Sequence, residues 1–250
     1  MARLTGKKAL VTGSSRGIGR GIAEGLAAAG ATVAINHPPG EDPTYGQEAL
    51  SAIESDGGEA FVLKADVSDE EDVRSMISTF EEKHGSIDIL VNNAGILTQS
   101  ELAEMPVEMW DETMSVDLRG VFLTTRFALP GMLDQGSGKI INVASQLGIK
   151  GSAELVHYSA AKGGVIAMTR ALAREVSPAV NVNAIAPGPI ETDLLDNTTD
   201  EWREAKEAEL PMDRLGTIED VVPTAVFLAS DESDYYTGQT LSPDGGDAMH

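Results

Sequence analysis

Residues 8–19 of this 250-residue chain read Lys8-Ala9-Leu10-Val11-Thr12-Gly13-Ser14-Ser15-Arg16-Gly17-Ile18-Gly19, and this stretch is the strongest indication of the fold. Its first five residues form a short apolar run that predicts a buried strand, and the spacing of Ile22, Leu26 and Ala29 predicts a helix that ends at Gly30. The N-terminus of a helix that follows a glycine turn directs backbone N–H groups and its dipole at an anion. We therefore expect a phosphate of a dinucleotide cofactor to bind at this turn.

The glycines of this turn are expected to have separate tasks. Gly13 permits the tight turn, while Gly17 and Gly19 let the backbone approach a pyrophosphate and let the helix pack against the strand. Their spacing is G-x-x-x-G-x-G, which differs from the commoner G-x-G-x-x-G. The predicted cofactor contacts in this loop are Gly13, Ser15, Arg16, Gly17, Ile18 and Gly19.

Strand-like and helix-like patterns alternate along the rest of the chain. Strands are predicted at 32–36, 60–64, 87–91, 139–143, 181–186 and 240–242, and helices at 47–55, 68–84, 106–127, 158–176, 201–209 and 218–229. Such alternation implies parallel strands joined by right-handed crossovers. We predict an α/β fold with a doubly wound parallel sheet of the Rossmann type, in a single domain over residues 1–250.

The end of the second predicted strand bears on the choice of cofactor. An acid there hydrogen-bonds the adenosine ribose and repels a 2′-phosphate, but this chain carries Asn36 and His37 instead. Arg16 in the glycine loop is placed to reach a 2′-phosphate. These residues favour NADP(H), and NAD(H) stays open as the alternative.

A second group of residues suggests proton transfer. Tyr158 and Lys162 are four apart, so a helix would place them on one face, where the ammonium would lower the pKa of the phenol. Ser145, thirteen positions before the tyrosine, adds a hydroxyl that could hold a carbonyl or alcohol oxygen. The three residues together predict an acid/base site for a small carbonyl or alcohol substrate.

Charge and composition together argue against nucleic acid, metal ions and membranes as partners. The chain has 40 acidic against 18 basic residues, a formal net charge of −22, so we expect no nucleic acid as a partner. Strong self-repulsion indicates a protein adapted to a salty cytoplasm, with an ordinary acidic cytosolic protein as the alternative. Without cysteine, and with four scattered histidines, we expect no metal site. The absence of a long apolar run predicts a soluble cytoplasmic protein that does not span a membrane.

With these residues placed, the chain resembles the short-chain dehydrogenase/reductase family over nearly its whole length. The matching motifs follow in order: Thr12 to Gly19, Asp66, Asn92-Asn93-Ala94-Gly95, Ser145, Tyr158 with Lys162, and Pro187-Gly188. The resemblance implies NAD(P)-dependent hydride transfer between a nicotinamide and a carbonyl or secondary alcohol, usually in a homotetramer.

The resemblance also implies roles for individual residues. Tyr158 would be the acid/base, Lys162 would lower its pKa and bind the nicotinamide ribose, and Ser145 would hold the substrate oxygen. Asp66, followed by Val67, resembles the residue that contacts the adenine, and Asn92 resembles the one that steadies the cofactor near the central strands. The remaining implied cofactor contacts are Asn93, Ala94, Gly95, Pro187, Gly188, Ile190 and Thr192.

Asp117 departs from the family pattern, which usually has an asparagine at this position holding a water that links the lysine to solvent. An aspartate can accept from that water but adds negative charge. Its charge would favour a protonated Lys162 and oppose a tyrosinate at Tyr158. We expect Asp117 to be part of a working catalytic site with an altered pH profile.

Several functions remain open. The stretch 211–216 resembles reductases of 3-oxoacyl thioesters, whereas the regions of Tyr158 and 238–241 fit glucose-type sugar 1-dehydrogenases equally well. Substrate choice is expected in the loop after Ser145, in the residues before Tyr158, and in a lid at 191–215. His157 is interpreted as a packing or surface residue rather than a ligand. A non-catalytic, dinucleotide-binding regulator is the alternative from another class.

Overall fold

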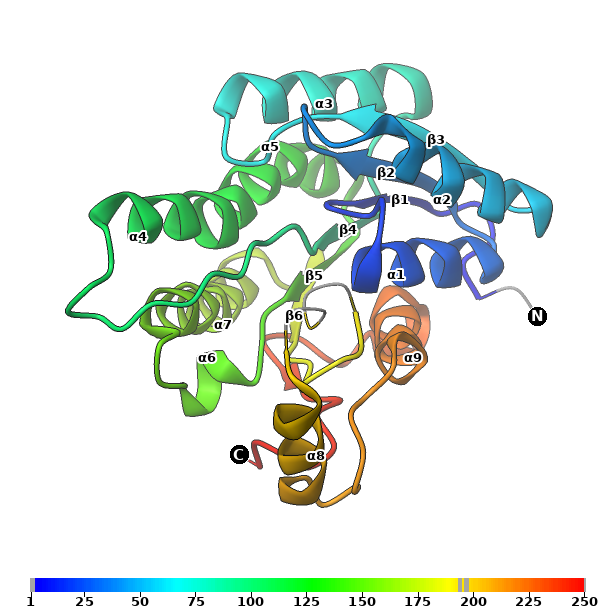
Figure 1. Ribbon diagram of the computed structural model, residues 1–250. Coiled ribbons are helices and arrows are strands. Elements are labelled where there is room, and N and C mark those ends of the chain that lie inside the picture. The colour runs from blue at the N-terminus through cyan, green and yellow to red at the C-terminus, as the bar shows by residue number, and fades with distance from the viewer. Residues whose placement is uncertain (1–2, 193–194, 196–197, 250) are drawn as a thin grey trace.

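A single parallel sheet organises the protein. The computed structural model describes residues 3–192, 195 and 198–249, and within them seven strands pair in parallel in the order β3-β2-β1-β4-β5-β6-β7 (Figure 1). The strands are β1 (Lys8–Val11), β2 (Thr32–His37), β3 (Glu59–Lys64), β4 (Ile89–Asn92), β5 (Gly138–Val143), β6 (Val180–Ile185) and β7 (Thr240–Leu241). The predicted doubly wound α/β fold is confirmed.

Helices cover both faces of this sheet (Figure 1). One face packs against α1 (Gly17–Ala28), α2 (Pro43–Ser55) and α9 (Ile218–Ala229), and the other against α3 (Glu70–His84), α5 (Gly120–Gln135) and α7 (Val156–Val176). The shorter helical elements are α4 (Val107–Met114), a π-helical segment (Ser115–Arg119), α6 (Leu147–Lys150), α8 (Asp200–Glu209) and a 3₁₀ turn (Asp231–Ser233).

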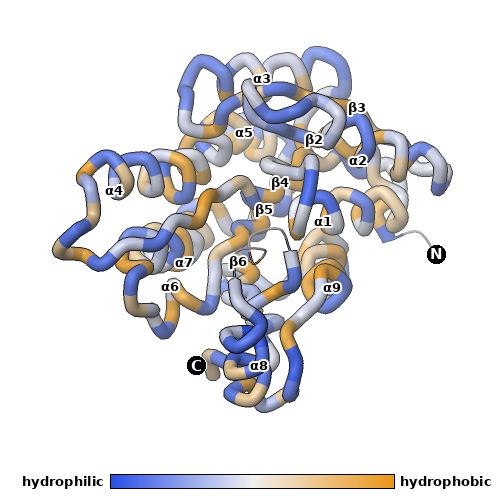
Figure 2. The backbone as a smooth tube through the Cα atoms, in the orientation of Figure 1, coloured by the Kyte–Doolittle hydropathy of each residue, from blue (hydrophilic) through white to orange (hydrophobic). Residues whose placement is uncertain are grey.

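Alternate side chains of each central strand enter different cores. On β1, Ala9 and Val11 belong to the core under α1 and α9, while Leu10 belongs to the core under α3 and α5. Both faces are therefore buried, which is why such strands read as continuous apolar runs in the sequence. Figure 2 shows the outlying helix α8 coloured mainly hydrophilic, and none of its described residues is buried.

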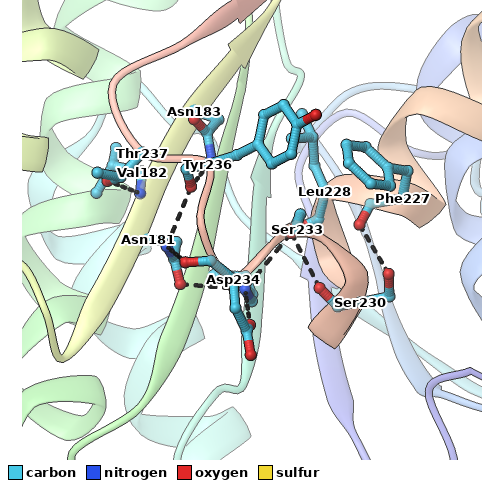
Figure 3. A network of polar contacts seen from close by, with 11 residues as sticks. Asn181, Val182, Asn183, Phe227, Leu228, Ser230, Ser233, Asp234, Tyr236 and Thr237 are labelled. Carbon is cyan, nitrogen blue, oxygen red and sulfur yellow. Dashed lines mark hydrogen bonds and ion pairs between the residues drawn. The ribbon is translucent and has the colours of Figure 1, made fainter.

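Two asparagines of β6 attach the segment that precedes the last strand to the sheet. The Asn181 amide donates to the backbone oxygens of Asp234 and Tyr236, at 3.0 Å each, and the Asn183 amide donates to Tyr236 at 2.8 Å (Figure 3). Because β7 is only two residues long, these side-chain bonds supplement a short ladder. They fix the segment that continues to Asp244, against which Gly188 in the loop after β6 packs.

The helix predicted over 106–127 differs from the structure. It is divided into α4, the π-helical segment and α5, and α5 runs on to Gln135 with Pro130 inside it. A proline usually ends or kinks a helix because it lacks an N–H. Here Met132, beyond the proline, is completely buried in the core, and this packing carries the helix on to a left-handed Gly136.

Two helix starts also differ from the prediction. The helix predicted from residue 68 begins at Glu70, because Ser68 donates both its N–H and its hydroxyl to Asp66, and Asp69 caps α3 by accepting from the Asp72 N–H at 2.9 Å. Helix α2 begins at Pro43, four residues before the predicted start at residue 47, since Asp42 caps it and proline suits the first helical position.

In the described part of the chain, no helix combines the length and apolarity required to cross a bilayer.

Candidate active site

Ser145 and Tyr158 meet at the carboxyl edge of the sheet. Ser145 lies two residues past β5 and Tyr158 in the first turn of α7, and the Ser145 hydroxyl is near enough to the phenol to act to lower the pKa of Tyr158. The Ser145 hydroxyl also accepts from the Leu147 N–H at 3.1 Å, which fixes its orientation at the start of α6. The two hydroxyls are thereby presented together, as a site that holds and protonates one substrate oxygen requires.

Lys162 lies one helical turn beyond Tyr158 and is almost completely buried. Its Nζ donates to the Val143 carbonyl at 3.2 Å, and it lies 5.5 Å from the centre of the Tyr158 ring. The helix spacing predicted from the sequence therefore brings the ammonium beside the phenol. The strand end at Val143 supplies a second anchor for it.

Asp117 reaches the same lysine from the π-helical segment. Its Oδ2 is 3.3 Å from Lys162 Nζ, and its Oδ1 accepts from the Ile96 N–H at 2.8 Å. The side chain is wholly buried, so the aspartate contacts the lysine directly rather than through exposed solvent. The sequence indicated the residue but not the π-helical turn, a feature that often marks functional sites.

The backbone of the glycine loop leaves no room for side chains at its glycines. Gly13 and Gly17 have φ of 59° and 58°, a region that disfavours residues with a Cβ. A Cβ on Gly13 would lie 2.8 Å from the Ala94 Cα, and one on Gly19 would overlap the Gly13 carbonyl oxygen. The turn leaves its backbone open to close approach, which fits a dinucleotide pyrophosphate.

The loop after β4 is attached to this turn. The Asn93 amide donates to the carbonyls of Thr12 and Gly13 at 3.0 and 2.9 Å, and the Thr12 hydroxyl accepts from the N–H groups of Asn93 and Ala94. Gly95 lies against Asp117 and Lys162, since its Cβ would be 3.0 Å and 3.2 Å from their side chains. Asn93, Ala94 and Gly95 thus connect the glycine loop to Asp117 and Lys162.

Asn92, by contrast, points into the sheet. Its amide donates to Asn142 at 2.8 Å and to Thr125 at 3.0 Å, and its carbonyl oxygen accepts from Thr124. It holds β4 against β5 and α5. Any steadying of the cofactor by Asn92 acts through the position of β4.

Residues at the ends of β2 and β3 are occupied by internal contacts. The side-chain oxygen Oδ1 of Asn36 accepts from the Gly13 N–H at 3.1 Å, and Nδ1 of a buried His37 lies 3.1 Å from the Pro38 carbonyl oxygen. Asp66 accepts from Ser68, and Val67 is buried against Gly120. Of these four residues, Asn36 is the one with a printed contact to the glycine loop, which it holds by this hydrogen bond.

The loop after β6 closes the remaining side. A Cβ on Gly188 would lie 2.7 Å from the Asp244 Cα, and Pro187 accepts from the Gln146 N–H at 3.1 Å. Ile190 forms a parallel bridge with Gly216, and the Thr192 methyl would be 4.0 Å from a Cβ on Gly17. The structure therefore brings the loops after β1, β4, β5 and β6 together. In the predicted lid, Asp193, Leu194, Asp196 and Asn197 lie outside the described residues.

Comparison with known proteins agrees with this geometry. A family model described as enoyl-(acyl carrier protein) reductase matches residues 13–247. A 3-oxoacyl-(acyl-carrier-protein) reductase from Staphylococcus aureus is 42% identical over 241 residues, covering 96% of this chain and 97% of the relative. A Synechocystis protein of the same name is 42% identical over 251 residues, covering 100% of both chains. The chain belongs to the short-chain dehydrogenase/reductase family.

Solved structures of this family superpose closely on the chain. A putative gluconate dehydrogenase from Agrobacterium tumefaciens has a TM-score of 0.94 and 37% identity, covering 100% of this chain and 98% of that one. A gluconate 5-dehydrogenase from Burkholderia cenocepacia, in complex with NADP and tartrate, has a TM-score of 0.93 and 35% identity, covering 98% and 96%. The chain is an NAD(P)-dependent oxidoreductase that transfers a hydride between a nicotinamide and a carbonyl or secondary alcohol.

The electrostatics of this dehydrogenase/reductase site differ from the prediction in one respect. Burial raises the pKa of Tyr158 above its usual value, and Asp117 adds to the rise, while Lys162 and Ser145 oppose it. Lys162 therefore lowers the pKa of Tyr158, as predicted, but the net direction of the shift is upward. The lysine acts in the expected direction, but loss of solvent around the phenol is the larger effect.

Asp117 and Lys162 influence each other as two buried, opposite charges. Burial alone would lower the pKa of Lys162, but Asp117 and Tyr158 together hold it above its ordinary value. Burial raises the pKa of Asp117, and Lys162 only partly offsets this. The direction predicted for Asp117 thus holds at both neighbours: it favours the ammonium and opposes the tyrosinate.

Other residues near the site were missed or only partly anticipated. His157 is completely buried with a ring nitrogen 2.9 Å from the Thr98 hydroxyl, which agrees with a packing role. Asp247, near the C-terminus, accepts from Lys150 and Lys206 and lies against Gln146, but nothing local in the sequence indicates this meeting. Among the described residues, no cluster of ligands suits a metal ion.

Proposed function

We propose that this chain is an NADP(H)-dependent reductase of 3-oxoacyl thioesters or similar small ketones. The observation that carries the proposal is the group formed by Ser145, Tyr158 and Lys162 beside a glycine loop that leaves backbone exposed to a dinucleotide. The Staphylococcus and Synechocystis relatives are both named 3-oxoacyl-(acyl-carrier-protein) reductases, which supports this substrate class.

In the proposed reaction, Tyr158 is the proton donor. Ser145 donates a hydrogen bond to the substrate carbonyl oxygen and holds it beside the phenol. A reduced nicotinamide, when bound, supplies the hydride to the carbonyl carbon. As negative charge grows on the carbonyl oxygen, Tyr158 releases its proton to that oxygen, and Lys162 stabilises the tyrosinate that remains. A raised pKa keeps Tyr158 protonated at neutral pH, which suits reduction more than oxidation.

The cofactor residues predicted from the sequence stay part of the proposal. Gly13, Gly17 and Gly19 would face the pyrophosphate, and Ile190 and Thr192 the carboxamide, since their loops converge there. NADP(H) is favoured because β2 ends without an acid and because the Burkholderia relative was solved with NADP. NAD(H) remains the alternative.

Oxidation of a sugar or sugar acid is the second candidate function. It is favoured by the two solved relatives named as gluconate dehydrogenases, and it continues the sugar 1-dehydrogenase alternative. A non-catalytic regulator is not carried further, because the named relatives are enzymes and the catalytic side chains are assembled.

The acidic composition and the assembly also remain proposals. Helix α8 carries acids along a face with no buried residue, and the chain as a whole has a net charge of −22, as expected for a protein that works in high salt. Phe122 on α5 is 51% exposed, which is consistent with a covered interface in a homotetramer. The cytoplasmic location stays a prediction.

The proposal is tested by measuring NADPH and NADH consumption with 3-oxoacyl thioesters and ketones, and NADP⁺ and NAD⁺ reduction with sugars and gluconate. Both are run at low and at molar KCl. We expect the highest kcat/KM for NADPH with a 3-oxoacyl thioester, rising with salt. Turnover confined to sugars or sugar acids would replace the first function by the second.

A further inference from the structure

The loop between β2 and α2 places the acidic side chain of Glu41 beside the glycine loop. After β2 the chain passes Pro38 and turns at Gly40, whose φ is 99°, and the Glu41 N–H donates to the Pro38 carbonyl at 3.4 Å. This turn carries Glu41 back over the loop instead of out into solvent. Its side chain is only 13% exposed.

Glu41 contacts the cation expected to select the cofactor. Its Oε1 is 3.5 Å from Arg16 Nε, and its Oε2 is 3.9 Å from His37 Nδ1. Oε2 is buried and makes no hydrogen bond within the described structure. A carboxylate with one oxygen left unsatisfied is poorly stabilised where it lies, because a buried polar group without a partner costs free energy.

The side chain of Arg16 lies largely in solvent. Its side chain is 57% exposed and its guanidinium carbon lies 5.9 Å from the centre of the Tyr45 ring. An exposed arginine can change partner at low cost, and a phosphate offers it two charge-assisted hydrogen bonds. The same guanidinium that would bind a 2′-phosphate therefore already contacts a carboxylate.

We propose that Glu41 is an internal competitor of the cofactor's 2′-phosphate for Arg16, and so sets how strongly the protein prefers NADP(H) over NAD(H). The acid that is missing at the end of β2 is supplied four residues later through the turn. Glu41 weakens the binding of NADP(H) without preventing it, since binding of the 2′-phosphate requires Arg16 to leave Glu41. Binding of NAD(H) leaves the contact between Arg16 and Glu41 intact. This inference rests on the proposed use of a nicotinamide dinucleotide.

The test is a binding titration that needs no turnover. Dissociation constants for NADPH and NADH are measured by cofactor fluorescence in the unmodified protein and in Glu41→Gln, Arg16→Ala and the double variant. Glu41→Gln is expected to tighten NADPH binding about fivefold and to change NADH binding by less than about twofold. In the Arg16→Ala background, the same substitution is expected to change neither.

A matched control removes the same charge nearby. Glu48→Gln lies on α2, with its carboxylate 3.9 Å from Arg20 and its side chain 64% exposed, and it should leave both constants unchanged. Thermal melting of each variant checks that the fold is retained. A protein that binds neither cofactor would contradict the proposed function. Normal binding with no gain in Glu41→Gln, or an equal gain without Arg16, would overturn the competition by Glu41.

Discussion

Lys162 Nζ and Asp117 Oδ2 lie 3.3 Å apart, with the lysine side chain 3% exposed and the aspartate side chain 0% exposed. A buried ion pair is stable only when its partners also have hydrogen bonds. Here Lys162 donates to Val143, and Asp117 accepts from Ile96. The π-helical segment that carries Asp117 thus places a buried carboxyl group directly behind the catalytic lysine.

Replacing Asp117 by asparagine should shift the pH profile of alcohol oxidation. Oxidation requires a deprotonated Tyr158, so its rate rises with pH through the pKa of that residue. Asp117 is one of the causes that raise this pKa, and removing its charge lowers it. The rising limb of kcat should therefore move to lower pH. Asp111→Asn, an exposed change on α4, is the control, and an unmoved limb in Asp117→Asn would separate the aspartate from Tyr158.

Replacing Lys162 by methionine should destabilise the fold as well as the reaction. The substitution leaves the carboxylate of Asp117 buried without its partner, a change that typically costs about 3–5 kcal/mol of unfolding free energy. Lys162→Met/Asp117→Asn should recover most of that loss, since the uncompensated charge is gone. Urea unfolding measures both, with exposed Lys83→Met as the control. If the single and double variants were equally unstable, charge pairing would not be the cause.

Asp247 should control the mobility of α8. Its carboxylate lies 2.7 Å from Lys150 and 2.9 Å from Lys206, so it joins α6 to α8 near Ser145. Asp247→Asn weakens both contacts, and we expect amide exchange over 200–209 to accelerate about tenfold, with KM rising more than kcat falls. Glu209→Gln provides the control, because Glu209 is 68% exposed and its contact with Lys206, at 3.4 Å, is longer than that of Asp247. Unchanged exchange in Asp247→Asn would contradict this account.

The same ion pairs imply that the attachment of α8 weakens at low pH. The lysines hold the pKa of Asp247 below its usual value even though burial opposes them. A depressed carboxyl pKa contributes stability that is fully present above the unfolded pKa and is lost as pH falls through the folded pKa. Exchange over 200–209 in the unmodified protein should therefore accelerate as pH is lowered below about 4, after correction for intrinsic exchange.

Gly13→Ala should weaken cofactor binding beyond the effect of backbone strain. Both Gly13 and Gly57 are left-handed, with φ of 59° and 81°, but only at Gly13 would a Cβ meet a neighbour, the Ala94 Cα at 2.8 Å. Gly57→Ala isolates the strain, which is about 1–2 kcal/mol. We expect Gly13→Ala to raise the Kd for NADPH at least about tenfold relative to Gly57→Ala. Equal affinities would mean that this turn does not hold the cofactor.

The sequence was sufficient for the alternation of strands and helices along the chain and for the residues at the carboxyl ends of the strands, whereas the order of the strands within the sheet was not predicted. The apolar run before Gly13 and the four-residue spacing of Tyr158 and Lys162 are local patterns, and local patterns fix elements and faces. The raised pKa of Tyr158 was not predictable, because burial depends on how α7 packs against the sheet. The position of Glu41 over Arg16 was missed for a similar reason, since it depends on a turn at Gly40.

The most direct test of the central claim compares the unmodified protein with Tyr158→Phe. NADPH consumption with a 3-oxoacyl thioester and the Kd for NADPH are measured on both proteins under the same conditions. The phenyl ring keeps its packing but cannot give a proton, so we predict a loss in kcat of about 10²–10⁴-fold, with Kd changed by less than about twofold. A Tyr158→Phe protein that retains the turnover of the unmodified protein would show that the proton comes from another group.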